Sequence, residues 1–136
     1  TLYPDGTVFL VAIGATLGKV AVSTVEGSAN QQINAILPEP GNDPHYLAYF
    51  LHGFREEVRV TSNGNTLGIL NQEGTKSLSV LRPPPAEQRE ISSELRKHDR
   101  REGDVIDAIH RSVSFLGEYR AALITAGVTG KIANLQ

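Results

Sequence analysis

The segment GATLGK, residues 14–19, contains the residue types of a phosphate-binding loop, with two glycines and a closing lysine. The loop of nucleotide hydrolases needs four residues between its glycines, then Lys, then Ser or Thr to bind magnesium. Here three residues separate Gly14 from Gly18, and Val20 follows Lys19. The spacing therefore argues against nucleotide hydrolysis. Glycines that permit a tight turn between two neighbouring strands are the simpler explanation.

A second kind of chemistry is base reading, which needs side chains with paired hydrogen-bond donors and acceptors. Such side chains gather in two clusters, Asn30 with Gln31 and Gln32, and Asn63 with Asn65 and Thr66. Asparagine also bonds readily to nearby backbone, so turn capping is the alternative for both clusters. The residue types alone leave both interpretations open.

Catalytic and metal chemistry find little support in the sequence. The chain has no cysteine, which removes thiol nucleophiles, thiolate metal sites and disulfides. Its four histidines, at positions 45, 52, 98 and 110, lack the ligand spacing of a familiar metal site. We therefore predict no catalytic residue, no metal and no cofactor.

Length and charge limit the classes of protein further. A chain of 136 residues suits one domain, or one domain with an appendage. With 13 basic and 15 acidic residues its formal net charge is -2, unlike the basic excess of a general nucleic-acid coat. Any DNA contact must therefore be local or shared with partners. The apolar runs are too short to cross a bilayer, so we expect a soluble, cytoplasmic protein without a membrane partner.

The first 82 residues read as short strands and turns. Runs rich in Val, Ile, Leu and Phe, separated by glycines and prolines, predict strands at residues 7–13, 19–25, 33–37 and 76–81. The segment PEPGNDP then forces a loop, after which Asn42 or Asp43 can cap a short helix that begins near Pro44. We predict a small mixed β-sheet with one short helix.

The pattern changes at the prolines of residues 83–85, which form a stiff linker. Residues 86–126 contain no proline, and apolar residues recur there in alternating steps of four and three, the period of a coiled-coil seam. The middle of the seam is polar, at His98 and Glu102, and Gly103 lies beside it. The sequence leaves open whether the helix bends or breaks at this point.

The predicted fold class is α+β, with the sheet region in residues 1–82 and the linker and long coiled-coil helix in residues 83–136. The small first region cannot cover so long a helix, so its apolar stripe needs another helix of a complex or a copy of itself. The predicted interface residues are Ile91, Leu95, Val105, Ile109, Leu116, Tyr119 and Leu123.

Five short segments follow one another in an order that is specific to a known family. They are GATLGKVAV at 14–22, ANQQINAILP at 29–38, PHYLAYFL at 44–51, PPPAEQREI at 83–91 and LGEYRAALITAGVTGKIA at 116–133. Together they span residues 14–133, nearly the whole length of the chain. On these segments the chain resembles the DNA-specificity subunit of type I restriction-modification enzymes.

The resemblance implies a function without catalysis. In that family a subunit carries two target-recognition domains, each followed by a conserved helix, and each domain reads one half of a split DNA sequence. The paired antiparallel helices set the spacing and dock methyltransferase subunits. This chain is then expected to hold the later part of one recognition domain and its helix. The partners implied are double-stranded DNA, methyltransferase (modification) and restriction subunits, and a second copy through the long helix when the chain is alone.

The resemblance also places the GATLGK turn near DNA, with Lys19 against a backbone phosphate. The expected DNA-binding residues are Thr16, Lys19, Asn30, Gln31, Asn63, Asn65 and Thr66. The alternative function is a self-associating structural coiled-coil protein whose sheet region binds no DNA. Salt-sensitive DNA association distinguishes the two, because only the first neutralises phosphates.

Overall fold

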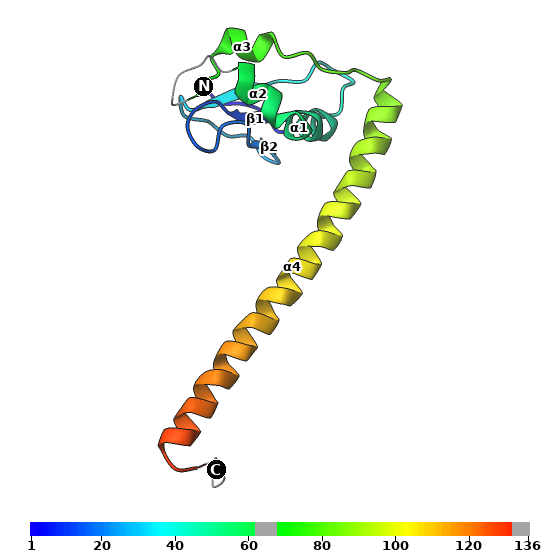
Figure 1. Ribbon diagram of the computed structural model, residues 1–136. Helices are drawn as coiled ribbons and strands as arrows, with labels where there is room; N and C mark the ends of the chain where they lie inside the picture. The colour runs from blue at the N-terminus through cyan, green and yellow to red at the C-terminus, as the bar shows by residue number, and fades with distance from the viewer. Residues whose placement is uncertain (62–67, 132–136) are drawn as a thin grey trace. The chain divides into compact units, whose positions relative to one another are not determined.

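The structure is a computed structural model that describes residues 1–61 and 68–131 (Figure 1). It contains two compact units, Thr1–Leu95 and Arg96–Gln136. The first unit holds a small sheet, short helices and the beginning of a long helix, and the second holds the remainder of that helix. The predicted α+β class is confirmed.

The sheet consists of antiparallel strands in the order β2-β1-β3. The described sheet is therefore antiparallel, and the prediction of a mixed sheet is wrong in this respect. The strands are β1 (Val8–Val11), β2 (Val20–Val22) and β3 (Ile33–Ile36). β1 ends at Val11, opposite the first residue of β3, Ile33. We call this end of the sheet the turn end. At the opposite end, Val8 at the beginning of β1 pairs with Ile36 at the end of β3.

The core lies on one face of β1, whose alternate side chains Val8 and Leu10 are fully buried. Leu10 packs with Leu17, Val58 and Leu70, each of which is at most 3% exposed. Burying one such side chain contributes about 1.5 to 3 kcal/mol. Because these residues come from four separate segments, the core joins the central strand to the turn after it, to a helix and to a later loop.

Two consecutive helices follow β3, α1 (Pro44–Gly53) and α2 (Arg55–Thr61). α1 packs against β1 and β2 (Figure 1). It begins at Pro44 because the Asp43 carboxylate accepts a hydrogen bond from the Tyr46 N–H at 2.8 Å. Of the two predicted caps, Asp43 is therefore confirmed. The sequence pattern does not indicate α2.

The strand predicted at residues 76–81 is wrong. α3 (Gln72–Lys76) ends where that strand should begin, and residues 78–84 have no regular secondary structure. The helix forms because the Asn71 side chain caps it, accepting a hydrogen bond from the Gly74 N–H at 2.8 Å. A local cap thus takes precedence over the β propensity of the residues that follow.

α4 (Pro85–Val128) is one helix of 44 residues. At about 1.5 Å per residue it is about 66 Å long. Pro85 stands at its first position, where the missing N–H would have no helical partner in any case. The helix is continuous through Gly103, so it does not break in its polar middle.

Candidate nucleic-acid interface

Segments from three parts of the chain meet at the turn end of the sheet. The Ala12 N–H donates to the Gln32 carbonyl oxygen at 2.8 Å, which joins the turn after β1 to the residues before β3. The Leu70 N–H donates to the Ala12 carbonyl oxygen at 2.8 Å, and the Gly14 N–H to the Gly68 carbonyl oxygen at 3.3 Å. We call the three segments joined in this way the turn-end segments: 12–19, 29–32 and 68–70.

The turn at residues 14–19 is anchored from within. Gly14 and Gly18 have φ angles of 83° and 82°, in the left-handed region that favours glycine. Between them, the Leu17 side chain enters the core. The N–H groups of Leu17, Gly18 and Lys19 donate to backbone carbonyl oxygens at 3.0 to 3.1 Å. Those three amides are therefore not available to cradle a phosphate, which agrees with the unfavourable glycine spacing.

Arg55, at the beginning of α2, braces this turn. Its Nε donates to the Leu17 carbonyl oxygen at 3.1 Å. A Cβ atom placed on Gly18 would lie 2.7 Å from Arg55 Cγ, so the arginine stem packs directly on that glycine. The sequence did not reveal this residue, because α2 itself carries no clear helical pattern and an arginine before two glutamates has no positional signal.

Thr16 and Lys19 are the outward-facing polar residues of the turn. Both are exposed, whereas Leu17 and Gly18 between them are buried. A hydroxyl and an ammonium group can each donate to phosphate oxygens, the contacts that fix a protein's register on a duplex. The turn thus presents two donors from a backbone that the core and Arg55 hold in place.

Asn30 and Gln31 are exposed just before β3. The Asn30 Oδ1 accepts the Gln32 N–H at 3.0 Å, and the Asn30 carbonyl oxygen accepts the Ile33 N–H at 3.1 Å. Asn30 therefore caps a turn, which is the alternative that its residue type allowed. Of the two side chains, Gln31 is consequently the stronger candidate for reading a base.

The second polar cluster, Asn63, Asn65 and Thr66, lies outside the described residues. Thr61 before it ends α2, and Gly68 after it accepts the hydrogen bond from Gly14. The described chain therefore resumes at the turn end, beside the GATLGK turn.

Charge is unequally distributed between the connections at the two ends of the sheet. The turn-end segments contain Lys19 and no acidic residue. The connections at the opposite end, which follow β2 and β3 or precede β1, hold four acidic residues: Asp5, Glu26, Glu39 and Asp43. α2 contributes Arg55 together with two glutamates, of which Glu56 pairs with Arg59 at 3.7 Å. The net charge of -2 therefore describes the chain as a whole, whereas the turn-end segments contain no acidic residue.

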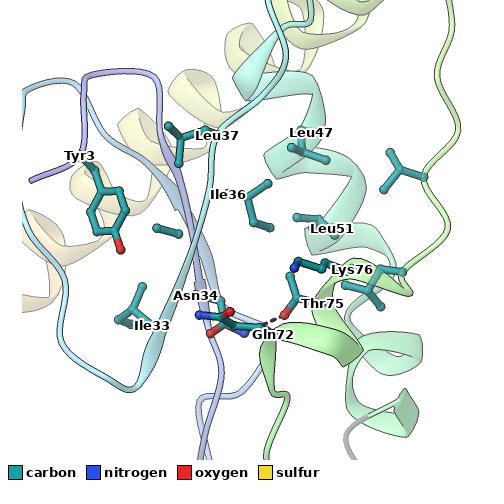
Figure 2. A pocket seen from close by; sticks show the side chains of 13 residues that line it. Tyr3, Ile33, Asn34, Ile36, Leu37, Leu47, Leu51, Gln72, Thr75 and Lys76 are labelled. Carbon is teal, nitrogen blue, oxygen red and sulfur yellow. Dashed lines mark hydrogen bonds between the residues drawn. The ribbon is translucent and has the colours of Figure 1, made fainter. Parts of the chain in front are cut away.

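A cavity of about 420 Å³ lies between β3, α1 and α3 (Figure 2). Its wall combines apolar side chains with four polar ones, Asn34, Gln72, Thr75 and Lys76. The Asn34 Nδ2 donates to the Leu70 carbonyl oxygen at 2.9 Å and to Thr75 Oγ1 at 2.6 Å. Asn34 therefore fastens the third turn-end segment to β3. None of the predicted DNA-binding residues within the described chain lines this cavity.

Metal-ligand clusters and membrane-spanning helices are both absent from the described chain, residues 1–61 and 68–131. No group of three or more His, Cys, Asp or Glu side chains there is arranged to hold a metal ion. No helix in the same residues is long and apolar enough to span a membrane.

The predicted helix-pairing residues all lie on α4, and only Ile91 is half-buried. The remaining six are exposed: Leu95, Val105, Ile109, Leu116, Tyr119 and Leu123. Exposure reaches 62% at Leu116, and Ile106 and Val113, outside the predicted seam, are 51% and 62% exposed. An apolar surface of this extent is typical of an interaction site, and it is broader than a single seam.

Comparison with known families agrees with these features. The sequence model of the type I restriction modification DNA specificity domain matches residues 1–111. The match covers most of the chain. The chain belongs to this family, and it therefore carries a specificity domain of a type I restriction-modification system.

A solved structure has a similar fold. The chain resembles a chain from a structural study of complex assembly and conformational transition of the type I R-M system, with a TM-score of 0.78 and 18% identity. The similarity covers 93% of this chain and 31% of that one, so this chain spans about a third of its length. The similarity shows that the fold of this chain also occurs in that chain.

Proposed function

We propose that this chain is a non-catalytic specificity component that directs methyltransferase and restriction subunits to a bipartite DNA site. Residues 1–82 recognise DNA, as part of a target-recognition domain, and residues 83–136 form the helical scaffold. The functional boundary at the proline linker precedes the boundary between the compact units, because the first turns of α4 belong to the first unit, where Gln88 bonds to the loop before α1.

The observation that carries the DNA-binding proposal is the turn end. Exposed Thr16, Lys19 and Gln31 lie on segments joined by backbone hydrogen bonds, and no acidic residue stands among them. Rigid presentation lowers the entropy lost on binding, and local absence of negative charge lowers repulsion from phosphates. In this proposal Thr16 and Lys19 contact the backbone, while Gln31 contacts a base edge.

The exposed apolar surface of α4 supports the scaffold role. In the complex it pairs antiparallel with a second helix and contacts the modification subunits. When the chain is alone, a second copy takes the place of that helix, and the chain is a homodimer. The seven predicted pairing residues remain the proposed interface.

The alternative, a self-associating coiled-coil protein that binds no DNA, is favoured by the same exposed surface. It accounts for α4 but not for the uneven charge of the sheet connections. It predicts full oligomerisation without any partner and no salt-sensitive DNA association.

Co-purification with the cognate methyltransferase subunit, followed by methylation of cognate and scrambled duplexes, tests the proposal. Gln31→Ala is expected to cost about 1 to 3 kcal/mol of discrimination on the proper site. Thr24→Ala, an exposed change in the connection at the opposite end, is the matched control and should leave discrimination intact. If the chain neither co-purifies with the subunit nor supports methylation, the specificity role is wrong.

A further inference from the structure

The first turns of α4 contain a buried polar side chain. Gln88 is only 2% exposed, although it belongs to a helix whose residues are mostly exposed. A buried carboxamide is expensive unless its donors and acceptor all find partners. Gln88 lies within the first compact unit, so its surroundings are those of the sheet and its connections.

Every polar position of the Gln88 carboxamide is engaged. Its Oε1 accepts the Asp43 backbone N–H at 2.9 Å. Its Nε2 donates to Asn42 Oδ1 at 3.1 Å and to the Pro83 carbonyl oxygen at 2.8 Å. One side chain therefore binds the loop before α1, the cap residue of α1 and the proline linker to the beginning of α4.

The loop residue Asn42, which binds Gln88, takes part in a further polar contact. Asn42 Oδ1 also accepts from Arg82 Nε at 3.0 Å, and Arg82 pairs with Glu39 at 2.9 Å. These groups follow β3, at the end of the sheet opposite the turn end. The beginning of α4 is thus attached where the predicted DNA contacts are absent.

We propose that Gln88 is a positioning residue that clamps the beginning of α4 to the recognition unit, and that this clamp keeps the DNA-reading surface in register with the partners of α4. The inference rests on the proposed function. A helix that can tilt at its first turn no longer holds the reading surface at one place relative to its partners. Duplexes with an altered gap between half-sites then become acceptable substrates.

The hydrogen-bond pattern requires glutamine at this position. Leucine at position 88 would remove one hydrogen-bond partner from the Asp43 backbone N–H, from the side-chain oxygen of Asn42 and from the Pro83 carbonyl oxygen. Glutamate would keep one acceptor but place a carboxylate against two carbonyl oxygens. Ser92 is the matched control, since it is 3% exposed on the same helix but its hydroxyl bonds only to the Arg89 carbonyl oxygen, at 3.2 Å.

The clamp itself is tested by a distance measurement that needs no DNA. Because the chain has no cysteine, Thr24→Cys and Ser93→Cys place one spin label on an exposed sheet connection and one on exposed α4. Pulsed electron resonance should show one narrow distance distribution in the parent and Ser92→Ala chains, and a broadened one in Gln88→Leu. Asn42→Ala removes an acceptor from the loop side and should broaden it as well. Equal widths in all four chains would overturn the clamp.

The functional consequence is tested in the complex with its modification subunits. Methylation rates are measured on duplexes whose gap has the cognate length and on duplexes one base pair longer or shorter. The preference for the cognate gap should fall about 10-fold to 100-fold in Gln88→Leu, since small misplacements have effects of that order. Ser92→Ala should retain it.

The ratio of rates separates positioning from poor folding, because a smaller folded fraction slows all duplexes equally and leaves the ratio unchanged. An unchanged ratio in Gln88→Leu, with a selective parent complex, overturns the positioning role alone. A parent complex that shows no DNA selectivity overturns the proposed function instead.

Discussion

The sheet unit and the distal part of α4 place their apolar residues in opposite ways. In the sheet unit Leu10, Leu17 and Leu70 are at most 3% exposed and belong to one hydrophobic cluster. On α4, Leu116 and Tyr119 are 62% and 56% exposed. The first region thus has a core built from its own residues, although it also exposes apolar side chains such as Val60 and Leu81. The large apolar residues described on α4 beyond Leu95 are all exposed, so burying them requires residues from outside. The two regions should therefore respond differently to the loss of one leucine.

The largest expected effect is at the helix surface. Leu116→Asp places a charge on the seam of both paired helices. Burial of each leucine is worth about 1.5 to 3 kcal/mol, so losing two weakens pairing by at least about 100-fold. Sedimentation or light scattering should show dissociation. Ser114→Asp, on the other side of α4, should leave pairing intact, and a parent chain that is monomeric at high concentration would contradict helix pairing.

Next in size is an effect confined to the sheet unit. Leu17→Ala empties a core position and should lower the free energy of unfolding by about 2 to 5 kcal/mol. Denaturant titration measures this loss. Because Leu17 belongs to the closed core, helix pairing measured below the unfolding midpoint should be unchanged. If Leu17→Ala changed helix pairing and left the free energy of unfolding unchanged, the contrast between the two regions would be wrong.

The two glycines of the turn provide a matched pair. Both have left-handed φ, so alanine at either should cost about 1 kcal/mol or more. Gly18→Ala should be worse, because its Cβ would meet Arg55 Cγ at 2.7 Å, whereas nothing lies within 4 Å at Gly14. Thermal unfolding of the two variants measures the difference. Equal losses would mean that Arg55 does not brace the turn.

On α4, replacing a glycine with alanine should raise stability rather than lower it. Gly103 lies in the helix interior, and a Cβ there meets nothing within 4 Å. Gly103→Ala should therefore stabilise the helix by about 1 kcal/mol, seen as a raised helical melting temperature by circular dichroism. A lowered melting temperature would indicate that the continuous helix does not persist at this point in solution.

The elements that the sequence predicted are those with strong local signals. Valine-rich runs between glycines marked β1 and β2, and the proline-free coiled-coil period marked α4. The sequence does not indicate α2 because, among residues 55–60, whose burial is described, only Val58 is buried, and one buried apolar position forms no stripe. The strand expected at 76–81 failed because Asn71 caps a helix just before it.

The candidate site was predictable in part. The residue types pointed to the polar loops, but the backbone pairing that brings segments 12–19, 29–32 and 68–70 together depends on strand order. Asn30 illustrates the limit, since its residue type permits both base reading and capping, and only the geometry shows the cap. Gln88 could not be found in advance, because a glutamine in a first helical turn is ordinarily exposed.

The smallest expected effect concerns a single exposed charge at the turn end. With about three phosphate contacts, the logarithm of DNA affinity should fall with the logarithm of salt at a slope of about -3, and Lys19→Ala should reduce that slope by about 0.9. All sequences should weaken alike, because a phosphate contact carries no base information. Lys76→Ala removes an exposed lysine outside the turn-end segments and should leave the slope unchanged. If both variants change the salt dependence of DNA affinity equally, DNA is attracted by charge spread over the whole protein. The proposal that the turn end is the binding surface is then wrong.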